Sequence, residues 1–422
     1  MRTTIRQGLL LDPATGGEQV ADLHIADGIV AGVGTAPTGF APERVIDAAG
    51  LAVSPGLVDL AVRLREPGFE HRASLDSELA AAVAGGITAV ACPPDMDPPL
   101  DEPGLVEMLT RRAAAVGLAR VHPLGALTQG LAGEKLAGLV ELARAGCVGF
   151  SQGDGAVGDS ATLLRALKYA ATFDLPVWMS PRDASLMRLG VAHEGEVATR
   201  LGLPGVPALA ETLAVSALLL IARETGVALH LCRLSVGESV EMVRQARARG
   251  QAVTCDVSSH HLHLSEMDIG YFDTNCRLSP PLRSLRDRDA LVAGVADGTV
   301  DAICSDHSPV NEDGKELPFS EADPGASGLE TLLSLTLMRS GDAGLAAKLA
   351  PVTVGPARVL RLPVPRLELG AVADICVFDP DAWWRVQPAD FVSRGRNTPF
   401  AGYELRGRVR YCLVGGRVVH GD

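Results

Sequence analysis

The stretch Pro55-Gly-Leu-Val-Asp-Leu-Ala-Val-Arg-Leu-Arg-Glu-Pro-Gly68 decides the fold of this 422-residue chain. Within it, Asp59, Ala61 and Arg63 alternate with apolar residues, so a strand of period 2 places these three side chains on one face. We therefore expect an apolar strand over residues 57–64 that delivers polar side chains to a site at its carboxyl end.

Seven further apolar strand patterns follow, separated mostly by Ala- and Leu-rich helical patterns. The eight predicted strands cover residues 57–64, 88–92, 121–126, 146–151, 176–179, 227–234, 252–257 and 300–304. Eight alternations over about 300 residues predict an α/β fold of the (β/α)8 TIM barrel type, with its site at the carboxyl ends of the strands. A doubly wound open sheet is the alternative, but no G-x-G-x-x-G follows the first strand and no phosphate loop occurs.

Both ends of the chain have a different texture from the middle. They consist of short strand patterns separated by turn signals, such as Asp27-Gly28. We expect residues 1–53 and 365–422 to form one small composite β domain, and residues 54–364 to form the barrel.

Composition excludes several classes of function. The net charge is −13 and the pI is about 5.3, which argues against nucleic-acid binding, because that needs a basic surface. No uninterrupted apolar run of about 18 residues offers a membrane span, and no signal-peptide pattern follows Met1, so we expect a cytoplasmic protein. The eight cysteines stand singly, without C-x-x-C pairs, which predicts reduced, buried thiols.

Polar side chains gather where the predicted strands end, and their convergence is the main chemical signal. Together with the apolar Ala61, the strand ends present Arg63, Arg65, Asp95, Gln152, Asp154, Ser180, Arg182, Arg233, His260, His261, Asp306 and His307.

Several motifs along the chain resemble those of the dihydroorotases, in the cyclic amidohydrolase superfamily. The first stretch resembles G-L-V-D-x-H-x-H-L-R-E-P-G, and residues 85–98 resemble G-G-x-T-x-V-x-x-M-P-N-T-x-P. Residues 254–262, 275–283 and 297–309 resemble T-x-E-V-x-P-H-H-L, N-x-K-x-x-P-P-L-R and D-G-T-I-D-x-I-x-T-D-H-A-P. The resemblance covers essentially the whole chain, and it implies a TIM barrel with a small β-sandwich formed by both termini.

The departures from the family pattern fall on its metal ligands. The resemblance places the former ligand positions at Ala61, Arg63, Gln152 (or Gly153), Ser180, Arg233 and Asp306, of which only Asp306 keeps a ligand of the family type. Catalytic zinc needs about three protein ligands, and a guanidinium has no lone pair to offer. We therefore expect no metal cofactor, and no catalytic residue beyond a remnant Asp306. Zinc is expected only if the chain is an active enzyme.

The arginines are expected to occupy the place of the metal. We hypothesise that Arg63 and Arg233 pair with Asp306, Asp95 or Asp154, the last through a shifted loop. The resemblance also implies a substrate pocket, in which Arg65 and Asn275 are kept. Asp95 replaces an asparagine and Val310 replaces a histidine, so dihydroorotate binding is expected to be weak.

Other reactive residues are expected to be structural. His260, His261 and His307 lie outside the family's metal shell, and His230 and Cys232 point to the face opposite Arg233. Ser180 has no G-x-S-x-G elbow, which argues against a serine nucleophile.

Three functions remain open. The first, which we favour, is a catalytically inactive dihydroorotase-like protein of pyrimidine biosynthesis. The resemblance implies that it serves as a structural or assembly subunit for the aspartate transcarbamoylase catalytic chain, as a homodimer or a larger assembly. The second is an active dihydroorotase with an atypical site. The third is a protein that binds an anionic metabolite through Arg63, Arg65 and Arg233.

Overall fold

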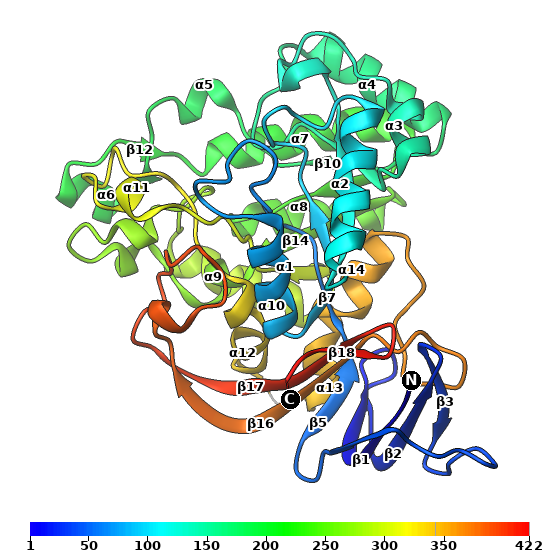
Figure 1. The fold of residues 1–422 in the computed structure, drawn as a ribbon. Coiled ribbons are helices and arrows are strands. Elements are labelled where there is room, and N and C mark those ends of the chain that lie inside the picture. The colour runs from blue at the N-terminus through cyan, green and yellow to red at the C-terminus, as the bar shows by residue number, and fades with distance from the viewer. Residues whose placement is uncertain (342, 422) are drawn as a thin grey trace.

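The computed structural model describes residues 1–341 and 343–421, and it confirms the predicted barrel (Figure 1). Eight parallel strands form one sheet in the order β15-β14-β13-β10-β9-β8-β7-β6. Their bounds are β6 Leu57–Asp59, β7 Ile87–Cys92, β8 Arg120–Ala126, β9 Gly149–Ser151, β10 Val177–Met179, β13 Leu229–Leu231, β14 Val253–Ser258 and β15 Ala302–Cys304.

Backbone hydrogen bonds beyond the ends of β6 and β15 bring the first and last strands of the barrel together. His307 N donates to Ala61 O at 2.9 Å, and Arg63 N donates to His307 O at 2.9 Å. The barrel is therefore nearly closed at its carboxyl end.

Most of the longer helices cover the outside of the barrel. The longer ones are α1 Leu75–Ala84, α2 Pro103–Val116, α4 Ser160–Thr172, α7 Leu209–Thr225, α8 Gly237–Ala248 and α10 Leu285–Ala296. The shorter ones are α3 Leu139–Ala145, α5 Ala184–Met187, α6 Glu196–Leu201, α9 Ser259–His263, α11 Glu312–Lys315, α12 Leu332–Leu337, α13 Leu345–Leu349 and α14 Val354–Val359. Several of these short helices lie in loops at the strands' carboxyl ends (α5, α6 and α11) or pack against the sheet formed by both termini (α12 and α13). Among the described residues, no helix combines the length and hydropathy that a membrane crossing requires.

Local sequence explains where several of these helices begin and end. Ser74 caps α1 in a reciprocal arrangement with Ser77, and the Asp159 carboxylate accepts the Thr162 N–H at the start of α4. Gly226 ends α7 with a φ of 71°, a left-handed conformation that glycine adopts without strain.

Strands from both termini form the second large sheet, which lies below the barrel in Figure 1 with both chain ends beside it. Most of its pairings are antiparallel, and the order is β18-β17-β16-β5-β1-β2-β3, with β4 also paired to β1. The bounds are β1 Arg2–Asp12, β2 Gly17–Ala26, β3 Ile29–Val33, β4 Arg44–Asp47, β5 Ala52–Pro55, β16 Ile375–Arg385, β17 Glu404–Val414 and β18 Arg417–His420. The β structure predicted from both termini is confirmed. A separate pair, β11 Ala192–His193 and β12 Gly205–Val206, lies within the barrel's loops.

The predicted alternation along the first barrel strand is only partly correct. β6 ends at Asp59, and beyond it Leu60 and Ala61 both pack into the barrel's interior cluster. The Asp59 carboxylate instead accepts the backbone N–H of Ser305 at 3.0 Å and that of Ala61 at 3.2 Å. Asp59 therefore helps to close the barrel and does not share a site with Arg63.

Candidate functional site

Six charged residues converge at the carboxyl ends of the barrel strands, and we call them the Arg–Asp cluster. They follow six different strands: Arg63 after β6, Asp95 after β7, Asp154 after β9, Arg182 after β10, Arg233 after β13 and Asp306 after β15. Three guanidinium groups thus face three carboxylates, and the formal charges balance.

Arg63 contacts all three aspartates. Its Nε donates to Asp95 Oδ2 at 2.9 Å, and its Nη2 lies 3.0 Å from Asp154 Oδ2. Its Nη1 lies 3.7 Å from Asp306 Oδ1 and donates to Ser308 Oγ at 2.9 Å. The arginine is only 7% exposed, so this buried charge depends on its partners.

Arg233 forms the other half of the cluster. Its Nη1 donates to Asp306 Oδ1 at 3.0 Å, and its Nη2 donates to Asp154 and, at 2.6 Å, to Ser180 Oγ. The hypothesis that Arg63 and Arg233 pair with Asp306, Asp95 and Asp154 agrees with these contacts.

Arg182 is the third arginine of the cluster, and no pairing was predicted for it. Its Nη2 lies 3.0 Å from Asp154 Oδ1, and its Nη1 donates to Ser279 Oγ at 3.0 Å. The signal for it was its position two residues after Ser180, at the end of a barrel strand.

Burial and the neighbouring arginines have opposite effects on the pKa of each carboxylate. Burial raises the pKa of Asp306, although Arg233 and Arg63 oppose that rise. Burial also acts to raise the pKa of Asp154, but Arg182, Arg233 and Arg63 together outweigh it and lower the pKa. Arg65 lies outside the cluster, and its pKa is lowered to about 10 by burial and then by the nearby Arg63.

Asp154, and not Gln152, reaches this cluster. Gln152 is buried, but its Oε1 accepts from Thr128 Oγ1 at 2.9 Å and its Nε2 donates to Leu131 O at 2.8 Å. Gly153 has a φ of 61°, and a Cβ there would lie 3.1 Å from the Asp95 Cβ. A glycine thus allows the chain to turn close to Asp95 and direct Asp154 inward.

The other residues predicted at the former metal and substrate positions make no ion pair with the cluster among the described residues. Ala61 packs in the barrel core, and Arg65 Nε donates to Pro309 O at 3.1 Å. Asn275 lies in a short 3-10 turn, Thr274–Cys276, where its backbone N–H binds Asp273. Within the described residues, no hydrogen bond or ion pair joins Asn275 to an arginine of the cluster.

A zinc ion does not fit the groups at this site. The Ala61 methyl group and the guanidinium groups of Arg63 and Arg233 supply no lone pairs. The carboxylates that could bind a cation are instead engaged by arginines.

Among the described residues, one group of side chains has metal-ligand geometry, namely His230, Cys232 and Asp256. His230 Nε2 is hydrogen-bonded to Asp256 Oδ2 at 2.8 Å and Nδ1 to Thr254 Oγ1 at 2.8 Å, so both ring nitrogens are engaged. Burial raises the pKa of the Cys232 thiol well above its usual value, which keeps it protonated. These contacts agree with a structural role for His230 and Cys232.

The other strand-end histidines are held by internal contacts. His307 Nε2 lies 2.6 Å from Glu78 Oε2, with both side chains fully buried. His261 Nε2 bonds to Pro281 O at 3.1 Å. His260 is held by packing, with its ring centroid 5.8 Å from that of Phe400; among the described residues neither of its ring nitrogens has a hydrogen-bond partner, and burial lowers its pKa to about 3. These features agree with the predicted structural roles.

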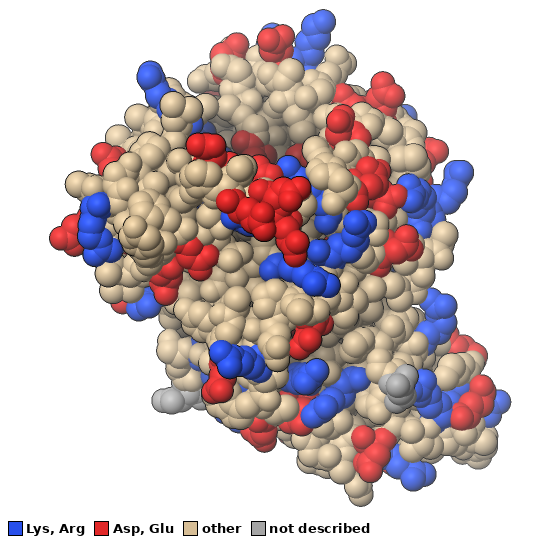
Figure 2. All heavy atoms as spheres, turned by 60° about the vertical axis from the view of Figure 1, so that its left-hand side comes forward, with Lys and Arg blue, Asp and Glu red and all other residues tan. Residues whose placement is uncertain are grey.

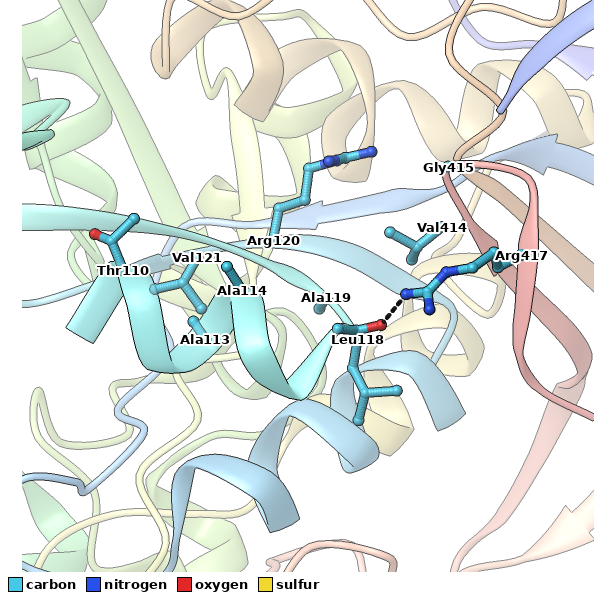
Figure 3. Close-up of a pocket in the computed structure, with 11 residues that line it drawn as sticks. Thr110, Ala113, Ala114, Leu118, Ala119, Arg120, Val121, Val414, Gly415 and Arg417 are labelled. Carbon is cyan, nitrogen blue, oxygen red and sulfur yellow. Dashed lines mark hydrogen bonds between the residues drawn. The ribbon is translucent and has the colours of Figure 1, made fainter. Parts of the chain in front are cut away.

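A surface hollow of about 440 Å³ lies far from this chemistry, between the end of α2 and the β17–β18 hairpin (Figure 3). Its wall on α2 includes Ala113 and Ala114, and Arg417 crosses to donate to Gly117 O at 2.7 Å. In Figure 2, acidic and basic side chains are interspersed over the face shown, without one extended basic area.

Comparisons with known proteins agree with the fold and identify relatives. The chain's fold matches a solved L-hydantoinase (dihydropyrimidinase) from Arthrobacter aurescens, with a TM-score of 0.87, 24% identity, and coverage of 99% of this chain and 96% of that one. A D-hydantoinase structure matches with a TM-score of 0.82 and 21% identity over 100% of this chain and 96% of that one. At these identities the likeness shows the fold alone.

Sequence relatives are closer. A family model described as dihydro-orotase-like matches residues 50–239. A "Dihydroorotase-like protein" from Pseudomonas aeruginosa is 44% identical over 100% of both chains. A "Dihydroorotase" from Syntrophotalea carbinolica is 41% identical over 100% of this chain and 99% of its own length. The chain belongs to the dihydroorotase-like family.

Proposed function

We propose that this chain is a catalytically inactive dihydroorotase-like protein that acts as a structural or assembly subunit in pyrimidine biosynthesis. The observation that carries the proposal is the Arg–Asp cluster, in which arginines after β6 and β13 contact the carboxylates at the strand ends. Hydrolysis of a cyclic amide needs an activated water, and the carboxylates of this cluster that could hold a catalytic metal are paired with arginines instead.

The proposal includes the absence of a metal cofactor. Its test is metal analysis of the full-length protein, expressed with added zinc and purified without chelators. We expect less than about half a zinc ion per chain, since a catalytic site needs about three ligands. A stoichiometric zinc content that is lost in Asp306→Asn would overturn the proposal.

The proposed partner is the aspartate transcarbamoylase catalytic chain, with this chain itself a dimer or part of a larger assembly. A cytoplasmic location and the partner both rest on the sequence and the family resemblance. Co-expression followed by size-exclusion chromatography with mass detection tests the partnership. Elution of the two chains as separate species at micromolar concentration would refute it.

An active dihydroorotase is the second candidate, because relatives with 41–43% identity bear the name "Dihydroorotase". Interconversion of dihydroorotate and carbamoyl aspartate by zinc-loaded protein would support it, provided that Asp306→Asn abolishes the turnover. Activity that persists in this variant would indicate a contaminating enzyme. The third candidate, an anionic-metabolite site at Arg63, Arg65 and Arg233, requires calorimetric binding of a dianion that is lost in Arg65→Met.

A further inference from the structure

One face of α7 carries exposed leucines on the outside of the barrel, and we call it the leucine stripe. Leu209, Leu213 and Leu220 are 57%, 47% and 53% exposed. With 3.6 residues per turn, the three leucines lie within about 40° of one another around the helix axis. The stripe carries no charge before Arg223, because the one earlier charged residue of α7, Glu211, is buried. A contiguous apolar face of this kind is typical of a contact with another molecule.

The helices on either side of the leucine stripe carry opposite charges. α4, α7 and α8 lie side by side, since they follow the adjacent strands β9, β10 and β13 in turn. The charged residues of α4 are Arg165 and Lys168, and both are exposed. On α8, Glu238 and Glu241 are exposed in the first half of the helix. The stripe therefore has a basic flank on α4 and an acidic flank on α8.

The two arginines of α8 are directed to its other side. Arg247 pairs with Asp301, just before β15, and Arg244 pairs with Asp297 at the end of α10. Both aspartates lie on the side of α8 away from α7, because α10 follows α8 around the barrel. Arg244 also contacts Glu241 from that side. The part of α8 that flanks the stripe thus remains acidic.

The face formed by these three helices is large enough for a stable interface. The 17 residues of α7 span about 26 Å, and neighbouring helices about 10 Å away on each side make the face about 30 Å wide. The face therefore offers up to about 800 Å² per copy, which is the area that each partner of a standard interface buries. The small side chains of Ser216 and Ala217 lie between Leu213 and Leu220 along the stripe, so a second helix can approach closely.

The flanking charges indicate which molecule covers the stripe. A two-fold axis parallel to α7 would place α7 against α7 of a second copy, with each residue opposite its own equivalent. The same axis places α4 of each copy beside α8 of the other, so basic residues meet acidic ones on both sides. An antiparallel pair would place α4 beside α4 and α8 beside α8, with like charges together. The order basic, apolar, acidic is therefore complementary to itself in one orientation.

We propose that the leucine stripe is the contact surface of a homodimer, in which α7 packs against α7 of a second copy about a two-fold axis parallel to the helix. In this dimer, α4 of each copy lies beside α8 of the other. The inference rests on the self-association that the proposed function includes, and it names the surface. Zinc content and co-elution with the aspartate transcarbamoylase catalytic chain are separate measurements, so their failure is distinguishable from failure of this dimer.

Sedimentation velocity of the full-length protein, from about 0.5 to about 100 µM, tests the dimer. We expect a Kd on the order of 1–10 µM at about 50 mM NaCl. Leu213→Glu places two carboxylates opposite each other at the centre of the interface and should weaken the dimer at least about tenfold. Leu285→Glu is the matched control, because Leu285 is 48% exposed at the start of α10, outside the stripe. The control should dimerise as the wild type does.

Charge reversal tests the orientation of the two copies. The α4 reversal, Arg165→Glu with Lys168→Glu, should weaken the dimer about five- to tenfold at low salt, and so should the α8 reversal, Glu238→Lys with Glu241→Lys. Both reversals in one chain restore opposite charges across the two-fold axis, so the Kd should return to within about threefold of the wild type. In an antiparallel pair, neither reversal alone would change the repulsion, because like charges would only change sign.

The proposal is overturned if the wild type stays monomeric up to about 100 µM, or if Leu213→Glu and Leu285→Glu dimerise equally well. It is also overturned if either reversal alone leaves the Kd unchanged, or if the combined reversal is weaker than each single one. A monomeric wild type that binds the aspartate transcarbamoylase catalytic chain, and loses it in Leu213→Glu, would assign the stripe to that partner instead. A dimer that persists in every variant would leave the proposed self-association standing but refute this surface.

Discussion

Replacement of Arg233 by methionine is the most direct test of the Arg–Asp cluster. The variant removes the 3.0 Å contact to Asp306, the contact to Asp154 and the 2.6 Å bond to Ser180. Asp154 keeps Arg63 and Arg182 as partners, but among the described residues the one cation left near Asp306 is Arg63, at 3.7 Å. The penalty should therefore arise mainly at Asp306, whose buried carboxylate loses its main counterion.

Breaking one partner of a buried pair typically costs about 3–5 kcal/mol. With an unfolding entropy of about 2.1 cal/mol/K per residue, 422 residues give about 0.9 kcal/mol/K, so the thermal midpoint should fall by about 3–6 °C. The control is Arg361→Met, which removes an exposed pair with Asp174 and should cost less than about 1 kcal/mol. Calorimetry at pH 7 measures both variants.

The loss should also depend on pH and on Asp306 itself. Burial already raises the pKa of Asp306, and loss of Arg233 raises it further, so the folded state of the variant binds this proton more readily. The variant's deficit should shrink as the pH falls through that pKa, and Arg233→Met with Asp306→Asn should be less destabilised than Arg233→Met alone. A fall of less than 1 °C in the single variant, or a double variant that is worse than the single one, would show that the cluster does not stabilise the barrel.

Three further predictions concern buried groups elsewhere in the barrel. Burial acts to raise the pKa of Glu78, but hydrogen bonds from His307, Ser393 and Ser77 outweigh it and lower the pKa. The ionised Glu78 therefore adds stability above pH 4.5, and this stability is lost as the pH falls. Glu78→Gln should flatten this acid dependence in thermal melts from pH 7 to pH 3, and an unchanged slope would contradict the assignment. Gln152→Ala should lower the free energy of unfolding by about 1–3 kcal/mol and increase hydrogen exchange in residues 128–133, because Thr128 and Leu131 lose a buried partner. Increased exchange at Arg63 or Arg233 instead would place Gln152 in the cluster. All eight cysteines are free and seven are buried. A thiol reagent should therefore modify at most Cys232 within minutes in the native protein, and all eight cysteines in guanidinium. Rapid modification of two or more thiols in the native protein would refute this.

The barrel was predictable because its signals are local. Each of the eight predicted strands matches an observed barrel strand. Short apolar runs between helical patterns are visible within a few neighbouring residues, so a sequence pattern is enough to find them. The bounds were less predictable. The first strand ends at Asp59, whose carboxylate accepts the N–H of Ser305, 246 residues away. A contact of that range leaves no trace in a local pattern.

The members of the cluster were predictable, but the pairing between them was only partly so. Strand ends of a barrel converge, so Arg63, Arg233 and Asp306 were expected to meet. The choice of Asp154 over Gln152 depends on the turn at Gly153, and the role of Arg182 depends on its reach to Asp154 and Ser279. Such side-chain directions follow from loop geometry, which sequence patterns do not specify.

The balance of charge in the cluster implies that its residues act as a unit. A single arginine facing the three carboxylates would leave excess negative charge, and an arginine without them would be a buried unpaired cation. A single change such as Arg233→His would therefore not rebuild a metal site. Positions 61, 63 and 180 would still carry alanine, arginine and serine, which are not the histidines of the family pattern. Asp154 would still be paired with Arg63 and Arg182. On the proposal that the chain holds no metal, a gain of metal binding would require coordinated changes at four strand ends, each of which first breaks an ion pair or alters a packed position.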